Sequence, residues 1–190
     1  MMRLNLGCGE FKKQGYVNVD INPRVKPDVL LDLNNLKSYS RFADSLFDEV
    51  FCEHVLEHLD RPFSVMKELH RILKPGGRLI IRVPHFSRGF THAEHEHGFD
   101  AGFPEYFNPS FKGGYMGFQF ILRKMRLRWI IRFDLKKTVI PSIAMLPLRA
   151  MNAVFNFLAN LNPYICSRFW CFYVGGFEEI EYVFTKPQTQ

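Results

Sequence analysis

The chain has 190 residues, of which 47% are hydrophobic and 23% are charged. This length suffices for one domain with a buried core, and this composition excludes a wholly disordered chain. The net charge of +6 is unevenly placed, because residues 1–110 hold 14 basic and 15 acidic side chains whereas residues 111–190 hold 11 and 4. We therefore expect a neutral first part and a basic second part with different roles.

The amino terminus and the four cysteines bear on the cellular compartment. Met1, Met2 and Arg3 lead directly into a strand-like run with no small-residue cleavage site, so we expect no signal peptide. No two cysteines have C-x-x-C spacing, and without an export signal this predicts reduced thiols. The sequence therefore predicts a cytoplasmic protein.

Short, continuous apolar runs predict strands that are buried on both faces of a parallel sheet. About nine residues separate the first run from the second, which is too few for a parallel crossover that contains a helix. We therefore predict an α/β sheet with few helices over its first half. The runs are residues 4–6, 16–21, 29–33, 49–52 and 78–83.

One amphipathic helix is predicted between the last two of these runs. We expect Asp60 as its N-cap and Pro62 in its first turn, and residues 74–77 (KPGG) end it. Its apolar residues recur every three or four positions, at Phe63, Met66, Leu69, Ile72 and Leu73.

The first apolar run ends in Gly7-Cys8-Gly9, and the second ends in Asp20. A dinucleotide site has a similar strand, glycine turn and acid, but it also has a third glycine, a helix and about 20 residues before the acid. The spacing here is too short for that arrangement. It indicates either a damaged nucleotide site or an intact site for another ligand.

Five motifs resemble, in order and spacing, those of class I S-adenosylmethionine (SAM) methyltransferases, and the compact type 11 group most closely. They are LNLGCGE, VNVD, LLDLNNL, FDEVFCEHVLEHL and LHRILKPGGRLIIRVP. The resemblance covers residues 4 to about 97. The C-terminal RFWCFYVGGFEEIEYVF is similar as well. The resemblance implies a Rossmann-like α/β fold, with a mostly parallel seven-stranded sheet that has one antiparallel strand. It also implies a single domain over 1–190, with a SAM-binding half at 1–97 and a substrate-side part at 98–190.

The chemistry of SAM agrees with the short spacing, because SAM has an adenosine and an amino-acid tail but no pyrophosphate. Gly7 and Gly9 lack a Cβ and let the backbone approach the methionine portion. Asp20 can accept hydrogen bonds from both ribose hydroxyls, whereas taken alone it would be a turn or cap residue. The predicted cofactor residues are Leu6, Gly7, Gly9, Asp20, Ile21, Asp32, Leu33, Asn34, Glu53 and His54.

The resemblance also implies roles for the later members of this set. Asp32 would accept from the adenine amino group, with Leu33 and Asn34 lining the ring. Glu53 and His54 would face the methionine end and the reacting methyl group.

Histidines supply the candidate general bases, which are needed only where the acceptor must lose a proton. We predict His54, His85 and His95 for this role. His54 and His58 have the i, i+4 spacing of a zinc motif, but the glutamate of H-E-x-x-H is displaced, so we predict a structural His58. The histidine-rich segment 85–97 is a polar loop, a loop over the active site or a metal site. Our prediction includes no metal.

A strand with one basic face is predicted in the second half, where Lys124, Arg126 and Arg128 alternate with apolar residues. This face is either a solvated surface or a contact for an anionic substrate or lipid head groups.

Residues 139–163 are the most apolar segment of the chain. Prolines, Arg149 and three asparagines interrupt it, so we predict no membrane span. From Pro147 onward, a narrow polar stripe lies on an otherwise apolar helix, and its members are Arg149, Asn152, Asn156 and Asn160.

The sequence therefore predicts a SAM-dependent methyltransferase with an unidentified small-molecule acceptor, which is glycan- or lipid-linked. Two alternatives stay open, namely a SAM- or nucleoside-binding module without catalysis and a peripheral membrane interaction protein. The modest net charge and the missing N/D-P-P-Y/F motif argue against a nucleic-acid partner. We predict a cytoplasmic location, with membrane association as an open alternative, and we make no prediction of oligomeric state.

Overall fold

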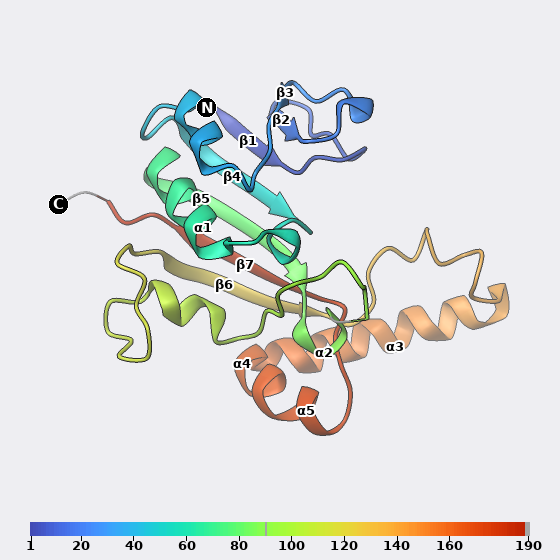
Figure 1. Ribbon diagram of the computed structural model, residues 1–190. Coiled ribbons are helices and arrows are strands. Elements are labelled where there is room, and N and C mark those ends of the chain that lie inside the picture. Colours follow the sequence, from blue (N-terminus) through green and yellow to red (C-terminus); the bar gives the residue numbers. More distant parts are fainter. Residues whose placement is uncertain (90, 189–190) are drawn as a thin grey trace.

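Seven strands form one sheet in the order β3-β2-β1-β4-β5-β7-β6 (Figure 1). The computed structural model describes residues 1–89 and 91–188. Strand β7 runs antiparallel to both of its neighbours, and the other pairs are parallel, so the predicted sheet is confirmed. The strands are β1 Arg3–Leu6, β2 Val17–Asp20, β3 Val29–Leu30, β4 Phe47–Glu53, β5 Leu73–Pro84, β6 Ile121–Arg128 and β7 Glu179–Thr185.

The helices are concentrated in the second half of the chain. Before β4, where every residue is described, the connections contain only loops and two 3₁₀ turns, Pro23–Val25 and Leu36–Arg41. The prediction of few helices over the first half is therefore confirmed. The remaining helices are α1 Pro62–Ile72, α2 Phe86–Gly89, α3 Ser142–Leu161, α4 Pro163–Ile165 and α5 Cys171–Tyr173, with 3₁₀ turns at Leu56–His58 and Phe103–Phe107 and a π-helical turn at Cys166–Trp170.

Helix α1 begins one residue later than its predicted cap implied. Arg61 occupies the N-cap position without a side-chain cap bond, and Pro62 is in the first turn. The predicted cap Asp60 instead pairs with Asn34, because its N–H donates to Asn34 Oδ1 at 3.0 Å. The assignment of Asp60 as cap is therefore wrong, since a tertiary contact holds this residue outside the helix.

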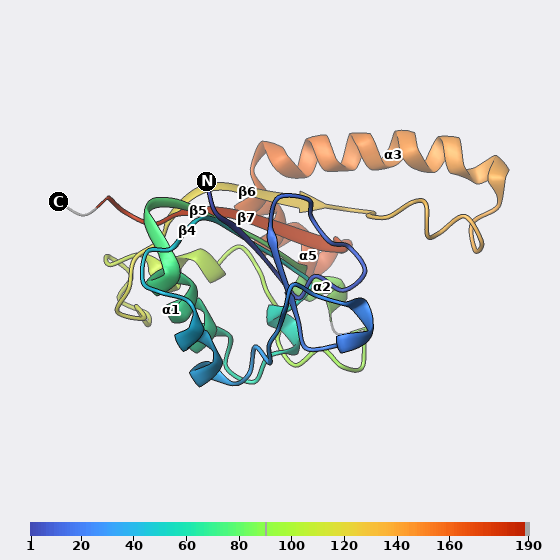
Figure 2. The same ribbon diagram turned by 90° about the horizontal axis from the view of Figure 1, so that it is seen from above.

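The two faces of the sheet differ in character. Figure 2 shows the sheet nearly edge-on, with α1 on one side and α3 on the other. On the side of α1 the sheet is apolar, and its buried residues include Leu79, Ile81, Val83, Ile180, Tyr182 and Phe184. Alternate positions of the same strands carry charge, as in the ion pair of Arg82 with Glu181 at 2.6 Å. The face on the side of α3 (Figure 2) is thus polar, and the short connections before β4 add no α-helix to it.

Helix α3 is attached to the end of β6 through its asparagines. Asn160 accepts from the N–H of Leu127 and donates to its carbonyl, both at 2.8 Å. Asn156 accepts from Trp129 N–H at 2.7 Å, and Asn152 accepts from Ile130 N–H at 3.0 Å. The polar stripe therefore satisfies the backbone of an edge strand, which would otherwise need water or another strand.

Helix α3 begins at Ser142, whereas the sequence indicated a helix from Pro147 onward. Pro147 lies inside the helix, where its missing N–H removes one intrahelical hydrogen bond. By length and composition, Ser142–Leu161 is a helix that could cross a membrane, and its most apolar window is only 6% buried.

Candidate functional site

The glycine turn between β1 and β2 has two glycines in left-handed conformations, with φ of +59° at Gly7 and +49° at Gly9. A Cβ on Gly7 would overlap Cγ2 of the core residue Val55, whereas a Cβ on Gly9 would meet no atom within 4 Å. Packing therefore requires glycine at position 7, and Gly9 borders open space at the carboxyl end of β1. Ligands of open α/β sheets bind at this edge.

Asp20 is held at the same edge by two backbone groups. Its Oδ2 accepts from Gly9 N–H at 2.7 Å, and its Oδ1 accepts from Asn22 N–H at 2.8 Å. Each carboxylate oxygen has a second acceptor site. The side chain is thus oriented by the turn and can still accept from a ribose diol.

The predicted adenine residues also lie at this edge, after β3. Asp32 forms an Asx turn in which Oδ1 accepts from Asn34 N–H at 2.9 Å, and its side chain is exposed. Leu33, like Leu6 in β1, is part of the buried core, and the Asn34 side chain bonds to Asp60. Ile21 is 62% exposed. The fold brings these residues to one edge, and their individual contacts with the cofactor stay predictions.

His54 follows β4 and adopts a positive φ of +53°, which is unusual for a residue with a side chain. Its Nε2 lies 3.0 Å from Glu179 Oε2 and its Nδ1 lies 3.3 Å from Glu57 Oε1. Burial lowers the pKa of His54, but the bonds and charges of Glu179 and Glu57 outweigh burial and raise it to about 9. At neutral pH His54 is therefore an imidazolium, which has no lone pair to accept a proton.

The raised pKa of His54 predicts a pH-dependent stability. Because the folded-state pKa of about 9 exceeds the ordinary 6.5, the stabilisation is complete below pH 6.5 and is lost as the pH rises through 9. We expect up to about 3 kcal/mol of unfolding free energy to disappear over this range, measured by urea denaturation. His54→Gln should remove this pH dependence. His70→Gln is the control and should retain it, because burial and then Lys186 lower the pKa of His70 to about 4.

Glu53 turns toward the polar sheet face. Its Oε1 lies 3.2 Å from Arg82 and 4.0 Å from Arg132. It lines a polar cavity of about 290 Å³, the Arg cavity, whose other charged residues are Arg126, Arg128, Arg132 and Glu179. The carboxylate of Glu53 therefore has Arg82 and Arg132 of the protein itself as its partners.

Of the predicted basic face, Arg126 and Arg128 line the Arg cavity. Arg128 also pairs with Glu179 at 3.2 Å and Glu181 at 3.0 Å. Lys124 is exposed on β6 and is not among the residues that line the cavity. The alternating pattern was thus sufficient to predict two of the cavity's arginines, but it did not predict which acids would pair with them.

The other two candidate bases are in different surroundings. His85 is fully buried, with its ring nitrogens 2.6 Å from Ser87 Oγ and 2.9 Å from Ser167 Oγ. Burial lowers the pKa of His85 to about 4, so it is neutral. His95 instead lines a cavity of about 370 Å³, which shares Ile131 and Arg132 with the Arg cavity. Of the three predicted bases, His95 is the one that faces a cavity as a partly exposed side chain.

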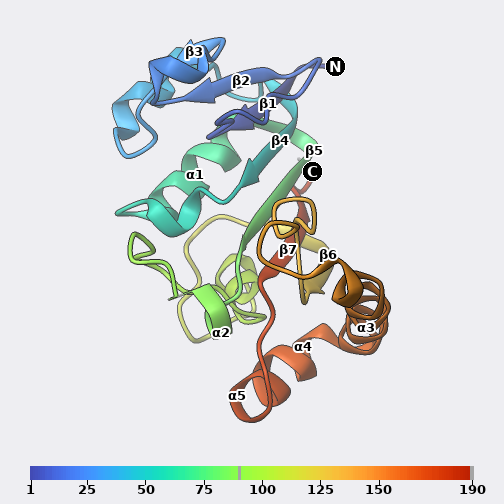
Figure 3. The ribbon, with the colours of Figure 1, turned by 90° about the vertical axis from the view of Figure 1, so that its right-hand side faces the viewer.

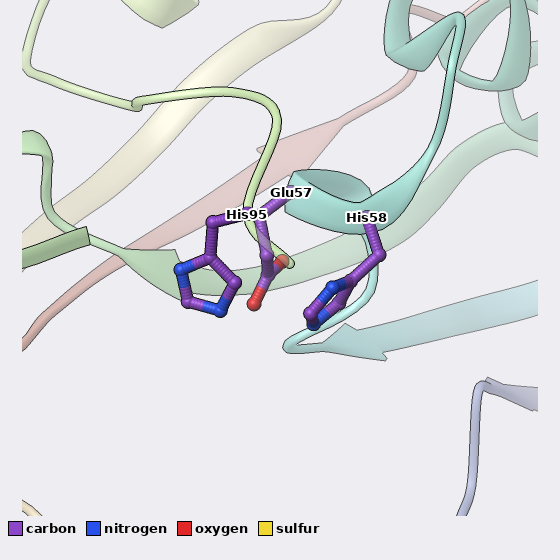
Figure 4. Close-up of side chains that lie close together, drawn as sticks. All are labelled: Glu57, His58 and His95. Carbon is purple, nitrogen blue, oxygen red and sulfur yellow. The ribbon is translucent and has the colours of Figure 1, made fainter. Parts of the chain in front are cut away.

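His95 also belongs to a cluster with Glu57 and His58 (Figure 4). One potential ligand atom from each residue lies within 4.8 Å of the others. Glu57 is fully buried, and its Oε2 has no hydrogen-bond partner among the residues that the structure describes. His58 Nδ1 lies 3.1 Å from the carbonyl of Glu94, which leaves Nε2 for another partner. These donors are of the types that bind transition metals.

His54 and His58, which have the spacing of a zinc motif, belong to different clusters. His54 lies beside Glu179, and His58 lies beside Glu57 and His95. Sequence reasoning predicted no role for Glu57 or Glu179. Glu179 is 125 positions from His54 in the chain, so no local pattern connects the two. Sequence reasoning also missed Arg132, for which the local sequence carries no recognisable signal.

Comparison with known proteins supports the family that the motifs indicate. Residues 4–81 match the model of a methyltransferase domain. A solved SAM-dependent methyltransferase from Archaeoglobus fulgidus superposes with a TM-score of 0.61 at 17% identity, over 97% of this chain and 86% of that one. Residues 4–81 are therefore similar to a methyltransferase domain, and the chain as a whole has the fold of a class I SAM-dependent methyltransferase. The predicted fold is therefore confirmed, and the match over residues 4–81 supports the predicted family and its cofactor, SAM.

Curated relatives of this chain are similar over short segments. A sterol 4-C-methyltransferase, strm-1, from Caenorhabditis elegans is 33% identical over 72 residues, which are 38% of this chain and 20% of that protein. A tRNA U34 carboxymethyltransferase from Nautilia profundicola is 38% identical over 61 residues, 32% of this chain and 20% of that protein. The chain thus matches about a fifth of the length of each relative. The names of the two relatives give different acceptors, a sterol and a tRNA.

Proposed function

We propose that this methyltransferase transfers the methyl group of SAM to a small molecule that carries an anionic group and is glycan- or lipid-linked. The observation that carries the proposal is the β1–β2 turn, where Gly9 borders open space and Asp20 is held by two N–H donors. All four cysteines are free thiols, which agrees with the cytoplasmic location that we propose.

Two neighbouring cavities support the position and the charge of the acceptor. The Arg cavity is lined by three arginines and by Glu53 and Glu179, so its net charge is positive. It meets the cavity of His95 at Ile131 and Arg132. An acceptor that places its anion near Arg126 and Arg132 can present its reacting atom toward His95.

The residues of this chain would contribute alignment and proton handling. Bound SAM supplies an activated sulfonium methyl group. The glycine turn and Asp20 orient the donor, and in-line alignment of two reactants is worth several kcal/mol. Where the acceptor must lose a proton, His95 is the base that the geometry favours, because His54 is charged and His85 is enclosed by Ser87 and Ser167.

Calorimetry and label transfer test this proposal together. We expect the chain to bind both SAM and S-adenosylhomocysteine (SAH), and to move label from methyl-labelled SAM into the small-molecule or lipid fraction of a cell extract. No binding of either compound would overturn the enzyme assignment. Binding without label transfer to any fraction would favour the alternative, a SAM-binding module.

Replacing His95 tests its role separately from cofactor binding. We expect His95→Asn to bind SAH within about twofold of the parent chain and to lose roughly 100-fold in methyl transfer, the usual effect of removing a general base. The control is His92→Asn, because the ring of His92 stacks on that of His95 at 4.6 Å but does not line the cavity. Equal rates in the two variants would contradict the assignment.

A further inference from the structure

Helix α3 has the opposite orientation to that of an ordinary surface helix. Its polar residues Asn152, Asn156 and Asn160 face the sheet and bond to the backbone there. Its apolar residues face outward, and Ile143 is 89% exposed. The outward face comprises Ile143, Leu146, Met151, Val154, Phe157, Leu158 and Leu161. A soluble helix normally buries its apolar stripe against the core, so this face lacks the cover that hydrophobic burial would provide.

The segment that follows α3 extends this apolar surface. Figure 3 looks along α3 and shows α4 and α5 beside it. Between them lies an apolar cavity of about 510 Å³, which is wide enough for part of a hydrocarbon chain. Trp129, Phe155, Leu158, Ile165 and Phe177 are among its lining residues. Exposed residues of the same segment include Tyr164, Phe169, Trp170, Phe172 and Tyr173.

The charge of this region indicates the chemistry of its partner. Residues 129–174 contain five basic side chains and a single acidic one. Lys137 and Arg149 are exposed close to or on α3, and Arg123 and Lys124 are exposed on β6. Exposed tryptophan and tyrosine beside basic residues are typical of surfaces at the interface of a bilayer. A second copy of the chain would bring the same positive charge against this one.

We propose that α3, α4 and α5 form a docking surface for an anionic lipid bilayer, with one hydrocarbon chain entering the apolar cavity. Basic residues attract anionic head groups, and burial of the outward apolar face supplies the rest of the affinity. The hydrogen bonds of three asparagines to β6 and to the two residues that follow it hold α3 along the sheet. A spanning orientation would break these bonds, so α3 lies in the interface.

This docking surface is next to the proposed acceptor site. Asn156 lines the Arg cavity while its neighbour Phe155 lines the apolar cavity, so α3 separates the two. An amphiphile held by its hydrocarbon chain would therefore have its head group near Arg126. This step, unlike the docking itself, rests on the proposed function.

Vesicle binding tests the docking surface without any methyl transfer. We expect the full chain to co-sediment with equimolar phosphatidylcholine–phosphatidylglycerol vesicles, less with pure phosphatidylcholine, and less again at high salt. The emission of exposed Trp170 should shift to the blue on binding. Ile143→Asp/Phe157→Asp should weaken binding by about tenfold or more, since each change removes a large apolar side chain from the interface. The matched control is Leu30→Asp on β3, which is 55% exposed at the far edge of the sheet.

Three results would overturn the proposal. The first is no binding to either vesicle. The second is equal binding by the double variant and the parent chain, with circular dichroism showing that both are folded. The third is a dimer, seen by sedimentation, that the double variant dissociates while vesicles are not bound, because this would assign the surface to a second copy. SAH affinity is measured in parallel, so a failure of docking is distinguishable from a failure of the proposed function.

Discussion

Asp20→Ala is expected to weaken the binding of SAH by about 10- to 100-fold. The carboxylate of Asp20 would accept two hydrogen bonds from the ribose, and bonds to a charged acceptor contribute about 1.5–3 kcal/mol each. Part of this energy is offset, because water hydrogen-bonds to the ribose hydroxyls of the unbound ligand. The measurement is isothermal titration calorimetry on the parent chain, Asp20→Ala and Asp20→Asn.

Two controls separate binding from folding in this experiment. Asp20 also accepts from Gly9 and Asn22, so its removal is expected to lower stability by about 1 kcal/mol per lost bond, which leaves the chain folded. Asp44→Ala removes an acid that pairs with Arg71 far from the turn, and it should bind SAH normally. Unchanged affinity in a folded Asp20→Ala would refute the ribose assignment.

Gly7→Ala is expected mainly to lower stability, whereas Gly9→Ala is expected mainly to lower the affinity for SAH. At position 7 the new methyl group overlaps Val55 and the residue has a positive φ, so we expect a loss of roughly 2–5 kcal/mol in unfolding free energy. At position 9 the methyl group has open space, and only the backbone strain of about 1–2 kcal/mol applies. SAH affinity should nevertheless fall at position 9, because the methyl group occupies the space that the ligand would approach.

Urea unfolding and calorimetry on both variants distinguish these effects. Adding Val55→Ala to Gly7→Ala should restore part of the lost stability, since it removes the side chain that the new methyl group overlaps. Two variants with equal stability would contradict the packing argument. Normal SAH binding by Gly9→Ala would show that the open space beside this residue is not used by the ligand.

The charged groups at the end of β4 explain why a histidine motif is a poor guide to metal or base chemistry. In EHVLEH, His54 and His58 are only four residues apart, yet one pairs with Glu179 and the other lies beside His95. The pKa of His54 depends on Glu179, which reaches it only because β7 inserts between β5 and β6. No local pattern contains that information, and this is why His54 was predicted as a base.

The sequence by itself determined the architecture of the first half. Nine residues cannot hold a helix and return along a strand, so Gly9 and Asp20 had to meet at one edge of a sheet whose connections lack helices. The motif order also indicated the methyltransferase domain that residues 4–81 match. These features depend on the length that a short connection can span and on the backbone conformation of its glycines. Both can be predicted from residues that are neighbours in the sequence.

Only the tertiary structure decided how the second half is used. The spacing of Asn152, Asn156 and Asn160 shows that they share one face of a helix, and the same spacing would suit a face in water. The structure instead turns this face onto the backbone of β6 and leaves Ile143 and Phe157 outside. Helical periodicity defines which residues point together, but the direction in which they point depends on the partner that the fold supplies.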